Sequence, residues 1–76
     1  MKLKTELTFP DRLKDQPILC DLCKKFNISM NILEASFSTD TGWAIVILEG
    51  TNADINSTLD YLKTSGIVLQ NTVNLA

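Results

Sequence analysis

The first segment of the chain alternates between residues suited to burial and polar residues, which is the pattern of a strand with one buried face. Its inward positions are Leu3, Thr5, Leu7 and Phe9. Pro10 and Asp11 end the strand, because proline cannot donate to a sheet ladder. The next segment repeats its apolar residues at helical spacing. That spacing predicts a helix whose buried stripe consists of Ile18, Leu19, Leu22, Cys23 and Phe26.

The ends of this first helix carry recognisable signals. Asp15 or Gln16 is placed to cap its start. Pro17 stands in its first turn, where the backbone N–H has no partner within the helix and is not missed. Asn27 ends the helix.

A hairpin is predicted for residues 27–50, with a polar turn at residues 39–42. Its first strand changes phase near Ile32 and Leu33, so either a bulge lies there or both faces are partly buried. The apolar residues before the change are Ile28, Met30 and Ile32, on one face, and those after it are Leu33, Ala35 and Phe37, on the other. The second strand, residues 43–48, is apolar at nearly every position, whereas a strand with one wet face should alternate. The strand therefore has more apolar surface than the helices on one face can cover. This surplus of apolar surface indicates a ligand, a partner subunit or a second domain on the other face of the sheet.

A second helix and a last strand follow. Thr51 or Asn52 caps the helix, and Asp54 lies at its positive end. The inner stripe of this helix is Ile55, Leu59 and Leu62, with Tyr61 at its border. Gly66 is expected to end it in a left-handed conformation. A strand then starts at residues 67–69, and the tail from residue 70 extends it or frays.

The resulting order is strand, helix, strand, strand, helix, strand. With right-handed crossovers this order predicts an α+β, ferredoxin-like βαββαβ fold, in which a four-stranded antiparallel sheet carries both helices on one face. The first and third strands are then central, and the second is an edge. We expect one domain spanning residues 1–76, with a core at about residues 3–70 and a tail at residues 71–76.

Composition narrows the functional classes. A chain of 76 residues buries only about 60% of its unfolded surface, so dimerisation would help it. The formal net charge of −2 gives no reason to expect nucleic acid as a partner. No apolar run approaches the ~20 residues of a membrane span, and the N-terminus lacks the apolar core of a secretion signal, so no membrane insertion is expected. Two cysteines three residues apart fit a reducing compartment, and the expected location is the cytoplasm.

The sequence contains few residues that could serve in catalysis. There is no histidine, which is the commonest general base, and no pair of carboxylates is placed to share a site. Arg12 is the only arginine, and its loop lacks the glycines that would cradle a phosphate. We therefore expect no enzyme activity, no catalytic residue and no cofactor.

Several short segments, distributed over all six elements, resemble the NIL domain family, which is named after an Asn-Ile-Leu tripeptide. The resemblance covers about residues 3–70, and its segments are Leu7-Thr8-Phe9-Pro10, Pro17, Phe26-Asn27-Ile28, Asn31-Ile32-Leu33, Gly42, Glu49-Gly50, Tyr61-Leu62 and Gly66-Ile67. It implies a ferredoxin-like fold close to the ACT amino-acid-sensing domains. NIL domains occur at the C-terminus of methionine ABC transporter ATPases, where they form dimers, bind methionine and inhibit transport, and they also occur fused to iron–sulfur ferredoxins.

The resemblance makes the predicted edge strand the candidate site. An edge strand offers unpaired backbone groups to a second copy or to a free amino acid. We expect ligand contacts from Met30, Asn31, Ile32 and Leu33, and a dimer interface at Ile32, Leu33, Ala35, Phe37 and Trp43. The alternative is that Ile32 and Leu33 are simply core residues and that Asn31 ends or bulges the strand. Trp43 either contacts a ligand or interface or caps the end of the sheet.

A second candidate site is the Cys20-Asp21-Leu22-Cys23 segment, because a CxxC pair can clamp a soft metal or act in redox chemistry. Such clamps lie in the loop before a helix, whereas Pro17 starts this helix earlier. Both cysteines are then in its middle turns, with Cys23 on the buried stripe. We therefore expect no metal site.

The sequence thus predicts a non-catalytic regulatory domain that binds a small molecule, such as the amino acid methionine, at or near a homodimer interface. A transporter ATPase or a ferredoxin module is the expected further partner, although neither a Walker A motif nor a four-cysteine run is present. The chain is either free-standing, which Met1 favours, or a fragment. The alternatives are a pure dimerisation module and, third, a soft-metal or redox carrier through Cys20 and Cys23.

Overall fold

The computed structural model describes residues 1–10, 18–38 and 42–75. Its elements in chain order are β1 (Lys2–Phe9), α1 (Ile18–Lys25), β2 (Ser29–Phe37), β3 (Gly42–Glu49), α2 (Asn52–Thr64) and β4 (Val68–Asn74). The predicted helix start at Asp15, Gln16 and Pro17, the loop with Arg12 and the turn residues 39–41 lie outside the described residues.

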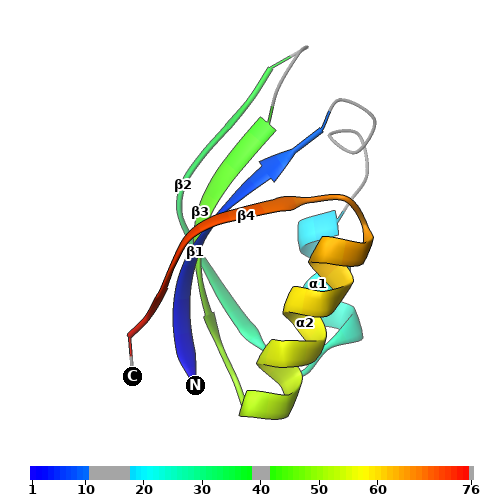
Figure 1. Cartoon of the computed structure of the whole chain (residues 1–76), viewed down its shortest axis with the longest axis vertical. Helices are drawn as coiled ribbons and strands as arrows, with labels where there is room; N and C mark the ends of the chain where they lie inside the picture. Colours follow the sequence, from blue (N-terminus) through cyan, green and yellow to red (C-terminus); the bar gives the residue numbers. More distant parts are fainter. Residues whose placement is uncertain (11–17, 39–41, 76) are drawn as a thin grey trace.

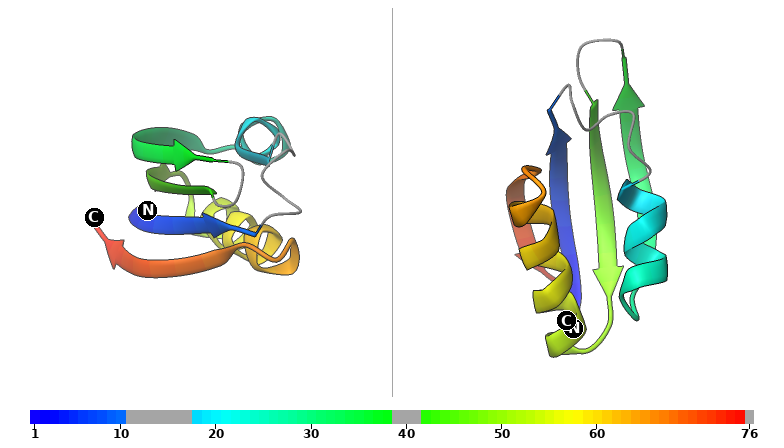
Figure 2. Two further views of the ribbon diagram at one scale, coloured as in Figure 1. Left: turned by 90° about the horizontal axis from the view of Figure 1, so that it is seen from above. Right: turned by 90° about the vertical axis from the view of Figure 1, so that its right-hand side faces the viewer.

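The four strands form one antiparallel sheet in the order β2-β3-β1-β4 (Figure 1). Both helices lie on the same face of this sheet, with α2 in front of β1 and β4 and α1 in front of β2 (Figure 2, right). The predicted ferredoxin-like fold is therefore confirmed, with β1 and β3 central and β2 at an edge. The segment after residue 70 continues the sheet as β4 rather than fraying.

The core lies between the sheet and the two helices. Every second residue of β1 and β3 is buried against the helices, as the alternation in β1 predicted. Each fully buried leucine or isoleucine stabilises the fold by roughly 1.5–3 kcal/mol relative to an exposed one. The buried apolar residues are Leu3, Leu7, Phe9, Leu22, Ala44, Val46, Leu48, Ile55, Leu62 and Ile67.

Helix α2 has a well-defined start and end. The hydroxyl oxygen of Thr51 accepts a hydrogen bond from the backbone N–H of Asp54 at 3.1 Å, and the hydroxyl donates to the Asp54 carboxylate at 2.9 Å. This cap satisfies an N–H that would otherwise have no partner within the helix. At the other end Gly66 has a φ of 95°, and Ile67 donates its N–H to the carbonyl of Leu62. Both predicted signals, the cap at Thr51 and the stop at Gly66, are confirmed.

Among the stripe residues of α1 whose side chains the structure describes, the prediction is wrong for Cys23, which is exposed, and the side chain of Ile18 lies outside this description. Leu22 is fully buried, while Leu19 and Phe26 are half-buried against the core. Successive residues of an α-helix are turned by about 100°, so a stripe centred on Leu22 leaves Cys23 at its margin. An eight-residue helix over an edge strand covers too little surface to bury that margin.

Strand β2 contains the predicted bulge. Met30 and Ile32 pair with Leu48 and Val46, but the pairing of Glu34 with Ile45 leaves Leu33 as an extra residue. After the bulge Ala35 and Phe37 pair with Ala44 and Gly42, which lie on the helix side of β3. Met30, Ile32, Ala35 and Phe37 therefore all share the helix side, so the prediction that the last two lie on the opposite face is wrong. The extra residue restores the phase of the strand.

Candidate functional site

The face of the sheet that points away from the helices is partly apolar. Trp43, Ile45 and Ile47 of β3 alternate with its buried residues and are half-buried. Val68 and Val73 of β4 are each 50% exposed, and their partners Thr8 and Lys4 place them on this same face. No element among residues 1–10, 18–38 and 42–75 covers it (Figure 2). The apolar surplus predicted for residues 43–48 thus lies on an open surface, which we call the open face.

Strand β2 is exposed along almost its whole length. Only Met30 is half-buried, while Ile32 and Leu33 are each 49% exposed and Phe37 is 52% exposed. In the part of the chain that the structure describes, β2 has a neighbouring strand on one side only. Its other side presents backbone N–H and C=O groups to the surroundings. Exposed apolar side chains on such an edge favour pairing with another strand.

The five residues predicted for the dimer interface do not form one surface. Ile32, Leu33, Ala35 and Phe37 follow one another along exposed β2. Trp43 pairs with Ser36 and Thr8 and therefore lies on the open face, opposite to Phe37. The Phe37 ring also packs within its own chain, at 5.5 Å between ring centroids from Phe9. It occupies the space above Gly42, where an added Cβ would lie 2.5 Å from a ring carbon.

Two of the four predicted ligand contacts line a common hollow. This hollow has a volume of about 220 Å³. Met30 and Asn31 line it, whereas Ile32 and Leu33 lie farther along β2. The complete lining is Lys2, Ser29, Met30, Asn31, Ile47 and Glu49.

 The volume of this hollow, ≈ 220 Å³, is smaller than that of pockets for drug-sized ligands, which begin at about 300 Å³. The hollow therefore suits a small metabolite, or it forms half of a site shared by two copies.

The side chains of this hollow fit a molecule that carries both a positive and a negative charge. Lys2 offers an ammonium group, Glu49 offers a carboxylate, and the Asn31 amide can both donate and accept. Asn31 pairs with Ile47 and so lies on the open face, beside an apolar side chain. A free amino acid has a carboxylate, an ammonium group and a side chain that match these three features.

The two cysteines are the third and sixth residues of α1, and both are free and exposed. Exposure removes one reason for treating Cys23 as a packing residue. Within the described ranges, however, no group of three or more histidine, cysteine or acidic residues could hold a metal ion. The pair has no third ligand in that part of the chain.

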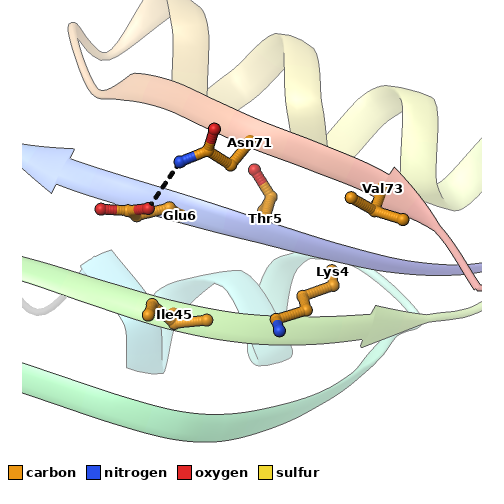
Figure 3. Close-up of a pocket in the computed structure, with 6 residues that line it drawn as sticks. All are labelled: Lys4, Thr5, Glu6, Ile45, Asn71 and Val73. Carbon is orange, nitrogen blue, oxygen red and sulfur yellow. Dashed lines mark hydrogen bonds between the residues drawn. The ribbon is translucent and has the colours of Figure 1, made fainter.

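A second hollow on the open face was not expected from the sequence. It lies between β1, β3 and β4, and Glu6 and Asn71 on its wall are joined by a hydrogen bond (Figure 3). Residues 70–76 lack a regular alternation, so the register of their pairing with β1 could not be predicted from the sequence. The one available signal was Asn71, a residue type that tolerates a left-handed backbone.

No helix in residues 1–10, 18–38 and 42–75 is long and apolar enough to cross a membrane.

The fold and the exposed edge define a small ferredoxin-like α+β domain with one open sheet face. The model of the NIL domain family matches residues 4–71, and this chain belongs to that family. The family resemblance noted from the sequence is therefore confirmed over nearly the whole chain.

Two relatives show how such domains occur. An uncharacterised protein of Synechococcus elongatus is 33% identical over 70 residues, which cover 88% of this chain and 86% of that protein. The methionine import ATP-binding protein MetN of Streptococcus mutans is 34% identical over 68 residues, which cover 84% of this chain but 19% of that protein. The chain thus spans about a fifth of the length of the ATP-binding relative.

A solved structure has the same fold. The C-terminal domain of an ABC transporter ATP-binding protein from Enterococcus faecalis superposes with a TM-score of 0.72 at 14% identity, covering 96% of this chain and 82% of that one. At this identity the likeness concerns the fold alone.

Proposed function

We propose that this chain is a non-catalytic regulatory domain that pairs with a second copy through β2 and binds a free amino acid, such as methionine, at or near the seam. The observation that carries the proposal is the exposed apolar edge of β2, which lies beside a hollow lined by one cationic and one anionic side chain. A transporter ATPase or a ferredoxin module is the proposed receiver of the signal.

Pairing through β2 is supported by its exposure. Ile32 and Leu33 leave about half of their surfaces in solvent, and the outer backbone of β2 has no neighbour among the described strands. A second β2 would satisfy these backbone groups and cover the apolar side chains. The gain matters for a chain of 76 residues, because a chain of this size buries only about 60% of its unfolded surface alone.

Binding of an amino acid is supported by the lining of the hollow at Asn31. Lys2 would contact the ligand carboxylate, Glu49 the ligand ammonium group, and Ile47 the side chain. The S. mutans relative is named as a methionine import protein, which makes methionine the first ligand to test. Ile32 and Leu33 would contact the ligand from the seam rather than from the hollow.

The mechanism that follows is a population shift. A ligand that binds better to one arrangement of the two copies favours that arrangement by the difference in binding free energy. An attached or associated protein would sense this arrangement. The domain itself needs no catalytic group for this role.

Calorimetric titration with methionine, combined with the mass in solution, tests the proposal. We expect a mass of twice the 8.4 kDa chain and heat on addition of methionine. Asn31→Ala should weaken binding at least about tenfold, because a hydrogen bond to a charged group contributes roughly 1.5–3 kcal/mol. Asn56→Ala on the exposed surface of α2 is the matched control and should leave binding unchanged.

Different outcomes separate the alternatives. A dimer that gives no heat or spectral change with any amino acid would identify a pure dimerisation module. A monomer at high concentration would contradict pairing through β2.

A further inference from the structure

Strand β4 contains an irregularity opposite Thr5. Lys4 pairs with Val73 and Glu6 pairs with Gln70, so β4 has one more residue than β1 between these two pairs. Asn71 lies in this bulge with a φ of 51° and is the one non-glycine residue with positive φ in the described ranges. A non-glycine residue with a left-handed backbone is uncommon, and asparagine is among the types that tolerate it best.

The bulge is held by hydrogen bonds on both faces of the sheet. On the open face the Asn71 amide nitrogen donates to a carboxylate oxygen of Glu6 at 3.0 Å (Figure 3). On the helix side the hydroxyls of Thr5 and Thr72 lie 2.9 Å apart and share a hydrogen bond. Bulges commonly redirect a side chain at a functional site, and this one directs the Asn71 amide over β1.

The result is a hollow of about 280 Å³ on the open face. Lys4 and Glu6 come from β1, Ile45 from β3, and Asn71 and Val73 from β4 (Figure 3). Glu6 is half-buried, and its contact with Asn71 restrains the carboxylate. The hollow therefore combines a cation, a restrained anion, an amide and two aliphatic side chains.

We propose that this hollow is a second binding site for a small zwitterion that carries an ammonium group, a carboxylate and a short apolar group. The Lys4 ammonium would bind the ligand carboxylate, Glu6 would bind the ligand ammonium group, and the apolar group would lie against Ile45 and Val73. Asn71 is a positioning residue that orients Glu6. The site shares a ligand class with the proposed function, but none of its lining residues lines the hollow at Asn31.

The test is an NMR titration of the ¹⁵N-labelled full chain with L-methionine as the zwitterionic probe. We expect amide shifts at residues 4–6 and 71–73. N-acetyl-methionine and methionine methyl ester each lack one of the two charges, and both should bind at least about tenfold more weakly.

Two variants make the test specific. Glu6→Gln keeps the shape of the side chain but removes its charge, and Asn71→Gly keeps the positive φ but removes the amide. Each should weaken the response at residues 4–6 about tenfold, whereas Asn56→Ala should not. The remaining amide positions of each variant report whether β4 stays paired.

Shifts confined to residues 29–31 and 47–49 would overturn this inference and leave the proposed function intact. Shifts at neither hollow would overturn both. Equal binding of the blocked probes, or an unchanged response of Glu6→Gln, would also overturn the inference.

Discussion

Two residues with positive φ define the backbone geometry before β4 and within it. Gly66, with a φ of 95°, ends α2 and turns the chain toward the strand. Asn71, with a φ of 51°, produces the bulge that brings its amide to Glu6. Single residues thus decide where the helix stops and where the ladder is interrupted.

Replacing Gly66 with alanine should destabilise the domain. A side chain in a left-handed conformation costs roughly 1–2 kcal/mol, so Gly66→Ala should lower the free energy of unfolding by about that amount. Urea denaturation measures the change. Ser65→Ala is the neighbouring control, because Ser65 has a φ of −74° and should change stability by only about 0.5 kcal/mol. Equal losses in both variants would contradict the explanation.

Both cysteines should react in the folded protein. Because Cys20 and Cys23 are exposed, a thiol reagent such as Ellman's reagent should modify two thiols per chain without denaturant. The single variants Cys20→Ser and Cys23→Ser should each lose one equivalent. A Cys23 thiol that reacts only after addition of urea would restore the original prediction of a buried stripe.

At the scale of elements, β2 keeps its apolar residues on one side despite an irregular spacing. The extra residue at Leu33 separates a first half, with Met30 and Ile32, from a second half, with Ala35 and Phe37. Both halves face the helix side, although their sequence positions differ in phase. The bulge therefore reconciles a sequence that breaks alternation with a strand that has one inner side.

Deleting Leu33 should be tolerated better than deleting Ala35. Without Leu33 the pairs of Ile32 with Val46 and of Glu34 with Ile45 would follow one another in a regular ladder. Without Ala35 the Phe37 side chain would move to the open face and lose its contact with Phe9. We expect a change within about 1 kcal/mol for the first deletion and a larger loss for the second in urea denaturation. The reverse order would contradict the assigned bulge.

At the scale of the whole molecule, the described residues form two layers, and none of their elements covers the open face of the sheet. The helices cover one side, while half-buried apolar residues of β3 remain on the other (Figure 2). A chain of this size has little core to spare, so pairing with a second copy would contribute a large share of its stability.

The thermal midpoint should therefore depend on protein concentration. If two copies pair through β2, dilution favours unfolding, and the midpoint should fall as the protein is diluted. Ile32→Lys places a charge at the exposed edge and should abolish this dependence. Differential scanning fluorimetry over a hundredfold range of concentration measures it. The same dependence in the Ile32→Lys variant would argue against the β2 seam.

Much of this architecture could be predicted from the pattern of the sequence. Alternation in residues 3–9 and helical spacing in residues 55–62 are local signals, and the caps at Thr51 and Gly66 are local as well. Cys23 was misplaced because periodicity does not report how much of a short helix the sheet covers. The hollow at Asn71 was missed because it depends on pairing between residues 65 positions apart.

The two ends of the described chain lie together at one end of the sheet (Figure 1). The terminal ammonium of Met1 donates to the carbonyl of Gly50 at 2.6 Å, and Leu75 donates its N–H to the carbonyl of Lys2 at 2.8 Å. Tethers attached at either end would thus leave from neighbouring points. A protein attached through one tether and a protein attached through the other would therefore be displaced together whenever the sheet gained or lost a binding partner.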